Sequence, residues 1–390
     1  MDVPPYPLYQ RSYLLYRLSP LHHAHAALLH PAALDAHARR LREQLQGDRV
    51  RGVDVDAPQR DDGHLGPLQQ CTWRLLGDED AWIDSYREPA TAALQPHLAR
   101  GIHVALDFET QSCSALLLRD PQLSAAASAS EAPHPPTALP LLLVRMPSTV
   151  RRVFLDYLAT AFDAHVAPLR LSSSFLTSSL ETYLRHLSHP GATHSVQDVI
   201  RQLHLQLSFP NATALLRHLD VTIAARDLPV FLRRASLLGN ARDTPFTSAL
   251  AAYMKKHFAL DISHPNVHVS RISCASFVLG TDRLKLSAPD ISDASIASSD
   301  TPEASAPELA VREFYASLVA EATGTANYLP SDFSPDTRSS TPSSVASTKA
   351  DARKRAGSNA NPSTRTTKRS RPRAQGNGES EPARDELAGS

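Results

Sequence analysis

Alternating apolar and polar residues mark the strands of this chain. In residues 101–109, the side chains of Ile102, Val104, Leu106 and Phe108 fall on one face of an extended segment. Residues 199–209 and 219–223 repeat this alternation and predict a hairpin with a long loop. Further strands are expected over 50–55, 71–76, 81–86, 114–119, 139–146, 267–272, 275–279 and 283–286. Connections this short exclude parallel crossovers, so the pattern predicts an antiparallel sheet.

Apolar residues spaced three and four positions apart predict helices between these groups of strands. The expected helices cover residues 31–46, 149–163, 174–187 and 246–258, with a short one beginning at 227. Groups of strands alternating with groups of helices are typical of an α+β fold. We therefore expect an antiparallel β-sheet with helices packed on one side.

The charge balance divides the chain into segments. The 390 residues hold 40 basic and 40 acidic side chains, but residues 1–285 have a net charge of +2, residues 286–348 of −7 and residues 349–390 of +5. We interpret 1–286 as the folded body, with a loop insertion at 121–138, and 287–307 as an acidic disordered linker. An amphipathic docking helix over 308–324 follows, which must pack on the body or on a partner. A disordered basic tail over 325–390 completes the chain.

The sequence offers little chemistry for catalysis or metal binding. It has no GxGxxG, no GxxxxGK and no GxSxG motif, and its three cysteines, Cys71, Cys113 and Cys274, show no CxxC spacing. The histidines at 22, 23, 25 and 30 lack accompanying ligands at zinc spacing. We expect no enzyme activity, no cofactor and no membrane segment, and a soluble protein of a reducing compartment.

Two basic clusters in the tail predict nuclear import. Twelve residues separate the first from the second, a length that suits a bipartite signal read by importin. The residues of the signal are Arg353, Lys354, Arg355, Lys368, Arg369, Arg371 and Arg373. Nonspecific binding to nucleic acid by the same charges is the alternative.

Four pairs of adjacent cations lie on the expected helices of the body. They are Arg39 and Arg40, Arg151 and Arg152, Arg233 and Arg234, and Lys255 and Lys256. Any single pair is typical of a solvated helix face. If all four helices cover one side of the sheet, the pairs would together line a groove for DNA, which is the second functional hypothesis: a nuclear DNA-binding or chromatin regulator.

Five strings of the body, Tyr16–Leu21, His37–Arg42, Gly47–Val53, Cys71–Leu76 and 267–279, together resemble the fungal CENP-L family, an inner-kinetochore subunit. The first lies near the start, at Tyr16-Arg17-Leu18-Ser19-Pro20-Leu21. The others are His37-Ala38-Arg39-Arg40-Leu41-Arg42, then Gly47-Asp48 with Arg51-Gly52-Val53, then Cys71-Thr72-Trp73-Arg74-Leu75-Leu76, and the segment 267–279. None of these strings is a catalytic or ligand-binding motif, but their order and spacing together are specific. The resemblance covers most of 10–286 and extends to the helix at 311–322.

The resemblance implies a curved antiparallel sheet similar to the RdgC type and a non-enzymatic role. It further implies pairing with a CENP-N homologue, association with other inner-kinetochore subunits and with CENP-A nucleosomes, and a location at the centromere in the nucleus. Chromosome segregation would be the process served.

The last strands of the body are expected to form the partner edge, because an unpaired strand edge invites sheet continuation. The expected contact residues are Val267, Val269, Ile272, Phe277 and Leu279, together with Phe314 and Leu318 of the docking helix. The sequence leaves open whether the body pairs with itself or with another chain. It also leaves open whether Ser334 and Thr341, each followed by proline, are phosphorylated.

Overall fold

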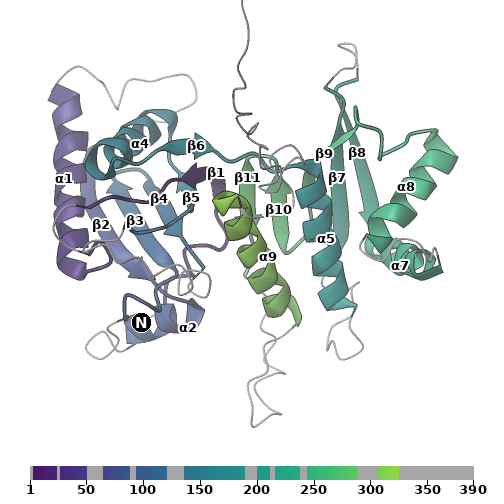
Figure 1. The fold of residues 1–390 in the computed structure, drawn as a ribbon, viewed down its shortest axis with the longest axis horizontal. Coiled ribbons are helices and arrows are strands. Elements are labelled where there is room, and N and C mark those ends of the chain that lie inside the picture. Colours follow the sequence, from purple (N-terminus) through teal and green to yellow (C-terminus); the bar gives the residue numbers. More distant parts are fainter. Residues whose placement is uncertain are drawn as a thin grey trace, which may run out of the picture. The chain divides into compact units, whose positions relative to one another are not determined.

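A single antiparallel sheet organises the folded part of the chain (Figure 1). The computed structural model describes residues 3–23, 27–50, 65–87, 94–120, 136–188, 200–210, 216–237, 244–288 and 306–324. These residues belong to one compact unit that extends to Pro335. Within them, the strands follow the order β2-β3-β4-β5-β1-β11-β10-β9-β7-β8, and β6 pairs with β1. The expected α+β class with an antiparallel sheet is confirmed.

The strands fall into an N-terminal half and a C-terminal half of the sheet, joined at β1. The N-terminal half contains β1 (Ser12–Leu18), β2 (Leu68–Leu76), β3 (Gly101–Phe108), β4 (Ser112–Leu118), β5 (Leu141–Arg145) and β6 (Val166–Pro168). The C-terminal half contains β7 (Gln202–Ser208), β8 (His218–Ala224), β9 (His268–Ser273), β10 (Phe277–Gly280) and β11 (Arg283–Leu286). Strand β1 pairs with β5 of one half and with β11 of the other.

The helices between these strands are α1 (Pro31–Val50), α2 (Glu79–Arg87), α4 (Ser148–Phe162), α5 (Ser173–Leu187), α7 (Leu228–Leu237), α8 (Pro245–Phe258) and α9 (Ala306–Thr323). A 3-10 turn, η1 (Ala225–Asp227), joins β8 to α7. Local capping explains some of their boundaries. The Ser172 hydroxyl, for example, accepts a hydrogen bond of 3.1 Å from the Phe175 amide and caps α5.

Both faces of the N-terminal half are buried. Successive side chains of a strand point to opposite faces, and in β5 the pair Leu141 and Leu143 enters one core while Leu142 and Val144 enter another. We call these the first core and the second core. A continuous run of apolar residues is what a strand buried on both faces requires.

The helices therefore lie on both sides of the sheet, not on one side as expected. Apolar residues of α1 and α4 belong to the second core, whereas those of α5, α8 and α9 belong to the first core. The periodicity of each helix identified its apolar stripe but held no information about which face of the sheet it would cover.

One local prediction of a strand is wrong, and a second lies almost wholly outside the described residues. Residues 81–86 lie in α2, because the Asp78 carboxylate accepts a 2.9 Å hydrogen bond from the Ala81 amide and caps a helix with Glu79 and Asp80 in its first turn. Of the strand expected over 50–55, only Val50 is described, and it is the last residue of α1. Residues 51–64 and 121–135, which include most of the expected insertion, lie outside the described residues.

His103 on β3 gives the folded protein a pH dependence. Its ring lies 6.0 Å from that of Trp82, and its Nε2 is buried with no hydrogen-bond partner among the described residues. Burial, with smaller contributions from the positive charges of Arg11 and Arg74, lowers the pKa of His103 to about 4. Between about pH 6.5 and about pH 4, His103 is therefore protonated in the unfolded chain but stays neutral in the folded chain.

We expect His103 to contribute a loss of stability as the pH falls from about 6.5 to about 4. The shift corresponds to a decrease of about 3 kcal/mol in the free energy of unfolding across that window. Urea denaturation at several pH values should show a smaller acid-induced loss in His103→Leu than in the wild type. His97→Leu, at an exposed position, is the matched control and should follow the wild type. Identical pH curves for His103→Leu and the wild type would contradict this assignment.

Candidate partner interface

The strands expected to form an exposed edge lie in the interior of the sheet. Strand β9 pairs with β10 and β7, and β10 pairs with β9 and β11, so both have neighbours on each side. Val269, Ile272, Phe277 and Leu279 are all buried in the first core, and Val267 packs against it. The expectation of an exposed edge there is wrong, because the hairpin of β7 and β8, earlier in the sequence, adds to the outer side of β9.

The edge of the C-terminal half is β8. It pairs with β7 in an unbroken register from Gln202 opposite Ala224 to Ser208 opposite His218, and the strand order ends there. Its apolar residues Leu219 and Val221 are only partly buried. An edge strand presents backbone N–H and C=O groups that no neighbouring strand satisfies.

Strand β2, the other edge, has two features that protect edges. Its pairing with β3 shifts in register between Leu68 and Gln70, which is the mark of a β-bulge. Helix α1 packs beside it, as Figure 1 shows at the end of the sheet opposite β8. A bulge and a covering helix both hinder pairing with another chain. Strand β8 is therefore the more open of the two edges.

Large apolar side chains are exposed near β8. Leu216, two residues before the strand, is 53% exposed, Val230 on α7 is 55% exposed, and Phe258 at the end of α8 is 62% exposed. Helices α7 and α8 lie at this end of the sheet (Figure 1). Leu216 precedes the first residue of β8 and Val230 follows its last, so exposed apolar side chains flank both ends of this edge strand.

Helix α9 docks on the body through apolar contacts. Phe314 and Leu318, expected as partner contacts, are buried in the first core together with Tyr315 and Val319. The ring of Phe314 stacks on Phe277 of β10 with 6.1 Å between centroids. Of the two possibilities left open by the sequence, body or partner, the structure shows the body.

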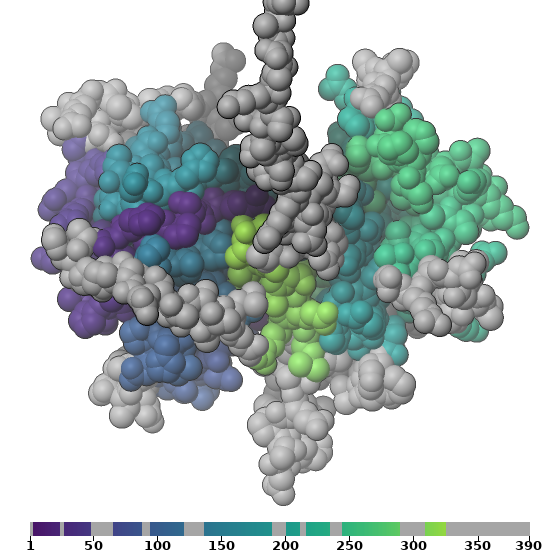
Figure 2. Space-filling view, in the orientation of Figure 1, coloured from purple at the N-terminus to yellow at the C-terminus, as the bar shows by residue number. Residues whose placement is uncertain are grey.

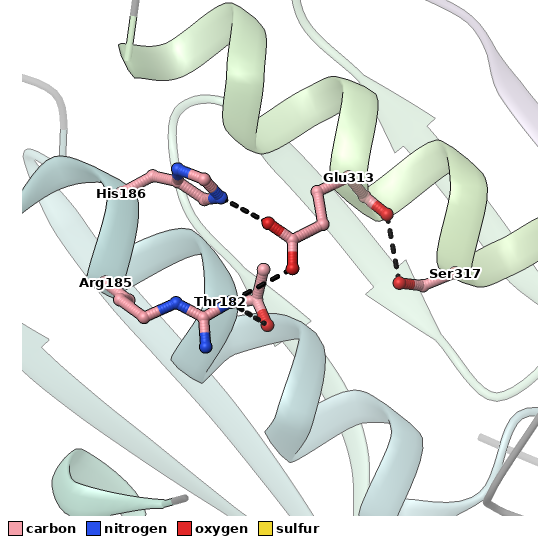
Figure 3. Close-up of polar contacts among 5 residues, drawn as sticks. All are labelled: Thr182, Arg185, His186, Glu313 and Ser317. Carbon is pink, nitrogen blue, oxygen red and sulfur yellow. Dashed lines mark hydrogen bonds and ion pairs between the residues drawn. The ribbon is translucent and has the colours of Figure 1, made fainter.

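A polar contact aligns α9 with α5 (Figure 3). The Glu313 carboxylate accepts a hydrogen bond from Arg185 Nη2 at 3.0 Å, and its second oxygen meets His186 Nε2. Arg185 also donates to the Thr182 hydroxyl, while the Ser317 hydroxyl donates to the Glu313 carbonyl. The side chains of Arg185 and Glu313 are well exposed, so the pair contributes at most about 1 kcal/mol and chiefly sets the register of the helices.

The other side of α9 contacts the N-terminal half. Arg17 of β1 donates to the Glu321 carbonyl at 2.9 Å, and the Tyr315 hydroxyl donates to the Arg119 carbonyl at 2.7 Å. The Arg100 guanidinium lies over the Tyr315 ring, 5.6 Å from its centroid. Burial raises the pKa of Tyr315 above its usual range, which keeps its hydroxyl a donor. Figure 2 shows α9 in yellow-green between β1 and α5, so it bridges the two halves of the sheet.

The four basic pairs do not meet. Helices α1 and α4, with the pairs at 39–40 and 151–152, contact each other over the second core. Helices α7 and α8, with the pairs at 233–234 and 255–256, contact each other over the first core, and Lys255 pairs with Asp261 at 3.1 Å. The premise of a single groove on one side of the sheet is therefore wrong, because the pairs lie on opposite faces.

The tail features predicted from the sequence lie outside the described residues, and the described residues hold neither a metal-binding cluster nor a membrane-spanning helix. The import signal at 353–373, both phosphorylation candidates and most of the acidic linker lie outside the described ranges. Within those ranges, His, Cys, Asp and Glu form no group of three suited to a metal ion. No helix of the same ranges is long and apolar enough to cross a membrane.

Sequence reasoning missed two features of this surface. The first is the β8 edge. Residues 219–223 alternate as a strand does, and the predicted hairpin gave them a partner on one side only, which could have indicated an edge strand. The second is Glu313, whose partners Arg185 and His186 lie more than a hundred residues away. No local pattern links such distant residues.

Within the described residues, the fold is a wide antiparallel sheet of the α+β class that ends at β8 and carries helices on both faces of its N-terminal half. The family follows from a direct comparison. A family model described as Centromere protein L matches residues 7–323, so the chain belongs to the CENP-L family. No curated protein matches the chain. The chain is thus a structural subunit of the centromere and kinetochore, and its process is chromosome segregation.

The matched range also bears on α9. The match ends at Thr323, the last residue of α9, and excludes the basic tail. The docked helix therefore belongs to the family's fold, although a stretch outside the described residues separates it from β11.

We expect Phe314→Ala to loosen α9 and destabilise the body. Removing a buried aromatic ring leaves a cavity against Phe277 and should lower the free energy of unfolding by about 3 kcal/mol. Equilibrium urea denaturation of the full chain measures the loss, and hydrogen exchange should show faster exchange in α9. Arg312→Ala, an exposed neighbour, should stay within about 0.5 kcal/mol of the wild type. Equal stability of the two variants would refute the docking.

Proposed function

We propose that this CENP-L chain is a non-enzymatic scaffold that pairs with a CENP-N homologue through the β8 edge. The observation that supports the proposal is that β8 ends the strand order of the described residues, with exposed Leu216 before it and exposed Val230 and Phe258 on the helices that follow it. In such pairing, a strand of the partner adds to β8 by main-chain hydrogen bonds, and the apolar side chains supply contact area.

The residues first expected at the interface have a supporting role in this proposal. Val269 and Ile272 hold β9 against β7 within the first core. They therefore position the hairpin that presents the edge, without touching the partner themselves. Phe314 and Leu318 act in the same way through α9, because they are buried beneath the helix.

The wider assembly follows from the same proposal. The pair of chains would associate with other inner-kinetochore subunits and help to hold CENP-A nucleosomes at the centromere, in the nucleus. Importin would deliver the chain by reading the basic tail. The rival hypothesis, a chromatin regulator that grips DNA between the four basic helix pairs, loses support because those pairs lie on opposite faces.

The double variant Leu216→Asp and Val230→Asp should reduce copurification with a CENP-N homologue at least tenfold. Both side chains are more than half exposed, so the charges should disturb the interface and leave the fold intact. Leu98→Asp is the matched control, because Leu98 is 58% exposed and lies outside the C-terminal half. Thermal melting checks the fold of each variant. Unchanged copurification, or loss of self-association alone, would show that the β8 edge does not serve a CENP-N homologue.

The basic tail should direct the chain to the nucleus. Substituting Lys368, Arg369, Arg371 and Arg373 with alanine removes the second cluster of the bipartite signal. A fluorescent fusion of this variant should spread into the cytoplasm, whereas substitution of Thr366 and Thr367 with alanine should leave nuclear accumulation unchanged. Full nuclear accumulation of the first variant would contradict the import role.

A further inference from the structure

Helix α7 ends in the string Leu232-Arg233-Arg234-Ala235-Ser236-Leu237. Two arginines that stand three and two residues before a serine, with an apolar residue directly after it, form the pattern that arginine-directed protein kinases select. In such kinases, carboxylates of the substrate cleft pair with the two guanidinium groups, and an apolar pocket receives the residue after the serine. Ser236 is the only serine or threonine of the chain that has arginine at both positions.

The beginning of α7 is anchored, whereas its end is at the surface. The Phe231 ring packs edge to face against Phe246 and Tyr253 of α8, with 6.0 and 5.4 Å between ring centroids, and it lies against the first core. Arg233 and Arg234, which follow it, are both exposed. The two arginines of the motif therefore lie where the cleft of a kinase can reach them.

Ser236 lies in the last turn of α7, one residue before the helix ends at Leu237. A kinase cleft takes its substrate segment in an extended form, so the turn that carries the serine must open before the reaction. A helix of 10 residues is marginal by itself, and its end opens at a small cost in free energy. The last turn can therefore open while Leu228 and Phe231 remain packed on the first core.

The two helices around the motif carry positive charge only. Helices α7 and α8 contain four basic residues, Arg233, Arg234, Lys255 and Lys256, and no Asp or Glu. No carboxylate of these two helices therefore competes with the acidic cleft of a kinase for the arginines of the motif. The positive charge of this end of the body also favours the approach of an acidic surface.

We propose that Ser236 is a phosphorylation site for an arginine-directed serine/threonine kinase. The Ser236 hydroxyl oxygen attacks the γ-phosphorus of ATP, and the bond from that phosphorus to the oxygen bridging it to the β-phosphate breaks. ADP leaves with that oxygen, and the hydroxyl proton passes to the catalytic aspartate of the kinase. The site is defined by α7 and goes beyond the pairing proposed for the β8 edge.

The phosphate changes the end of α7 in charge and in conformation. Phosphoserine carries about two negative charges at neutral pH, so the charge of α7 and α8 together falls from the +4 of their four cations to about +2, with histidine counted as neutral. The C-terminus of a helix already bears partial negative charge, so a phosphate in the last turn is unfavourable there. We expect the last turn of α7 to open in the phosphorylated chain.

The first test incubates the full chain with ATP and the catalytic subunit of cyclic-AMP-dependent protein kinase, an arginine-directed kinase. Mass spectrometry of chymotryptic peptides follows each site separately. Ser236 should react at least about tenfold faster than exposed Ser148 and Ser188, which have arginine three residues before them but not two, because each charge-assisted pair with a guanidinium adds roughly that factor. Arg233→Gln and Arg234→Gln together should slow the reaction of Ser236 more than about tenfold for the same reason.

The matched control is the double variant Lys255→Gln and Lys256→Gln, which removes the same charge from α8 and leaves the motif intact. It should slow the reaction of Ser236 less than about threefold, because exposed charges outside the cleft are screened by salt. Thermal melting checks the fold of both variants. Equal slowing by the two variants would overturn the proposal in favour of general charge attraction. So would a reaction of Ser236 in a synthetic peptide of residues 228–240 but not in the folded chain.

The second test examines the chain purified from dividing cells. The chymotryptic peptide that contains Ser236 should carry a phosphate in the wild type and should lack it in the double variant Arg233→Gln and Arg234→Gln. A peptide that is recovered at every stage of the cell cycle and is never phosphorylated would overturn the proposal. Copurification with a CENP-N homologue is scored separately, so failure of the pairing at β8 does not alter this result.

Hydrogen exchange tests the expected opening of the helix end. Backbone amides in the last turn of α7 should exchange at least about threefold faster in the phosphorylated chain than in the unmodified chain, whereas those of α8 should be unchanged. Ser236→Asn, which adds no charge, is the control and should exchange as the unmodified chain does. Equal rates in the phosphorylated and unmodified chains would overturn the conformational effect.

Discussion

The pairing of β1 with β5 on one side and β11 on the other is the interaction on which the rest of the fold depends. Leu14 lies opposite both Val144 and Arg283, residues separated by more than a hundred positions in the sequence. Without β1, the two halves of the sheet would have no shared backbone ladder. Because β1 joins the two halves into one continuous sheet, the positions of both cores and of the β8 edge depend on this strand.

Helix α9 reinforces the same junction from outside the sheet. Its apolar side enters the first core, Glu313 aligns it with α5, and Arg17 of β1 donates to its last turn. A lone helix of this length is marginal in water, so its stability comes from docking. The family match that ends at Thr323 indicates that this closure is part of the fold that the family shares.

Local patterns predicted the local elements well and their neighbours poorly. The alternation over 101–109 identified β3, and the apolar stripe over 149–163 identified α4, because each pattern reflects burial of one element. Residues 81–86 were predicted as a strand but lie in helix α2, because the Asp78 carboxylate caps the start of that helix. The order of the strands could not be predicted from local patterns, for a different reason. Whether β9 is an edge depends on where the β7 and β8 hairpin pairs, and nothing within β9 records that.

A partner strand at the β8 edge would extend the polar rows of Lys285 and Arg271 on the C-terminal half of the sheet. A partner strand added at β8 would continue the same sheet, and the rows of Lys285 and Arg271 would then run on into the partner. Alternate residues of that added strand would face the same side as Arg271 and Arg283, because the period of a strand is two residues. Partner pairing at the edge would therefore widen this polar side of the sheet without covering it. Among the described residues the second core ends at β1, so the C-terminal half of the sheet buries only the face that meets the first core.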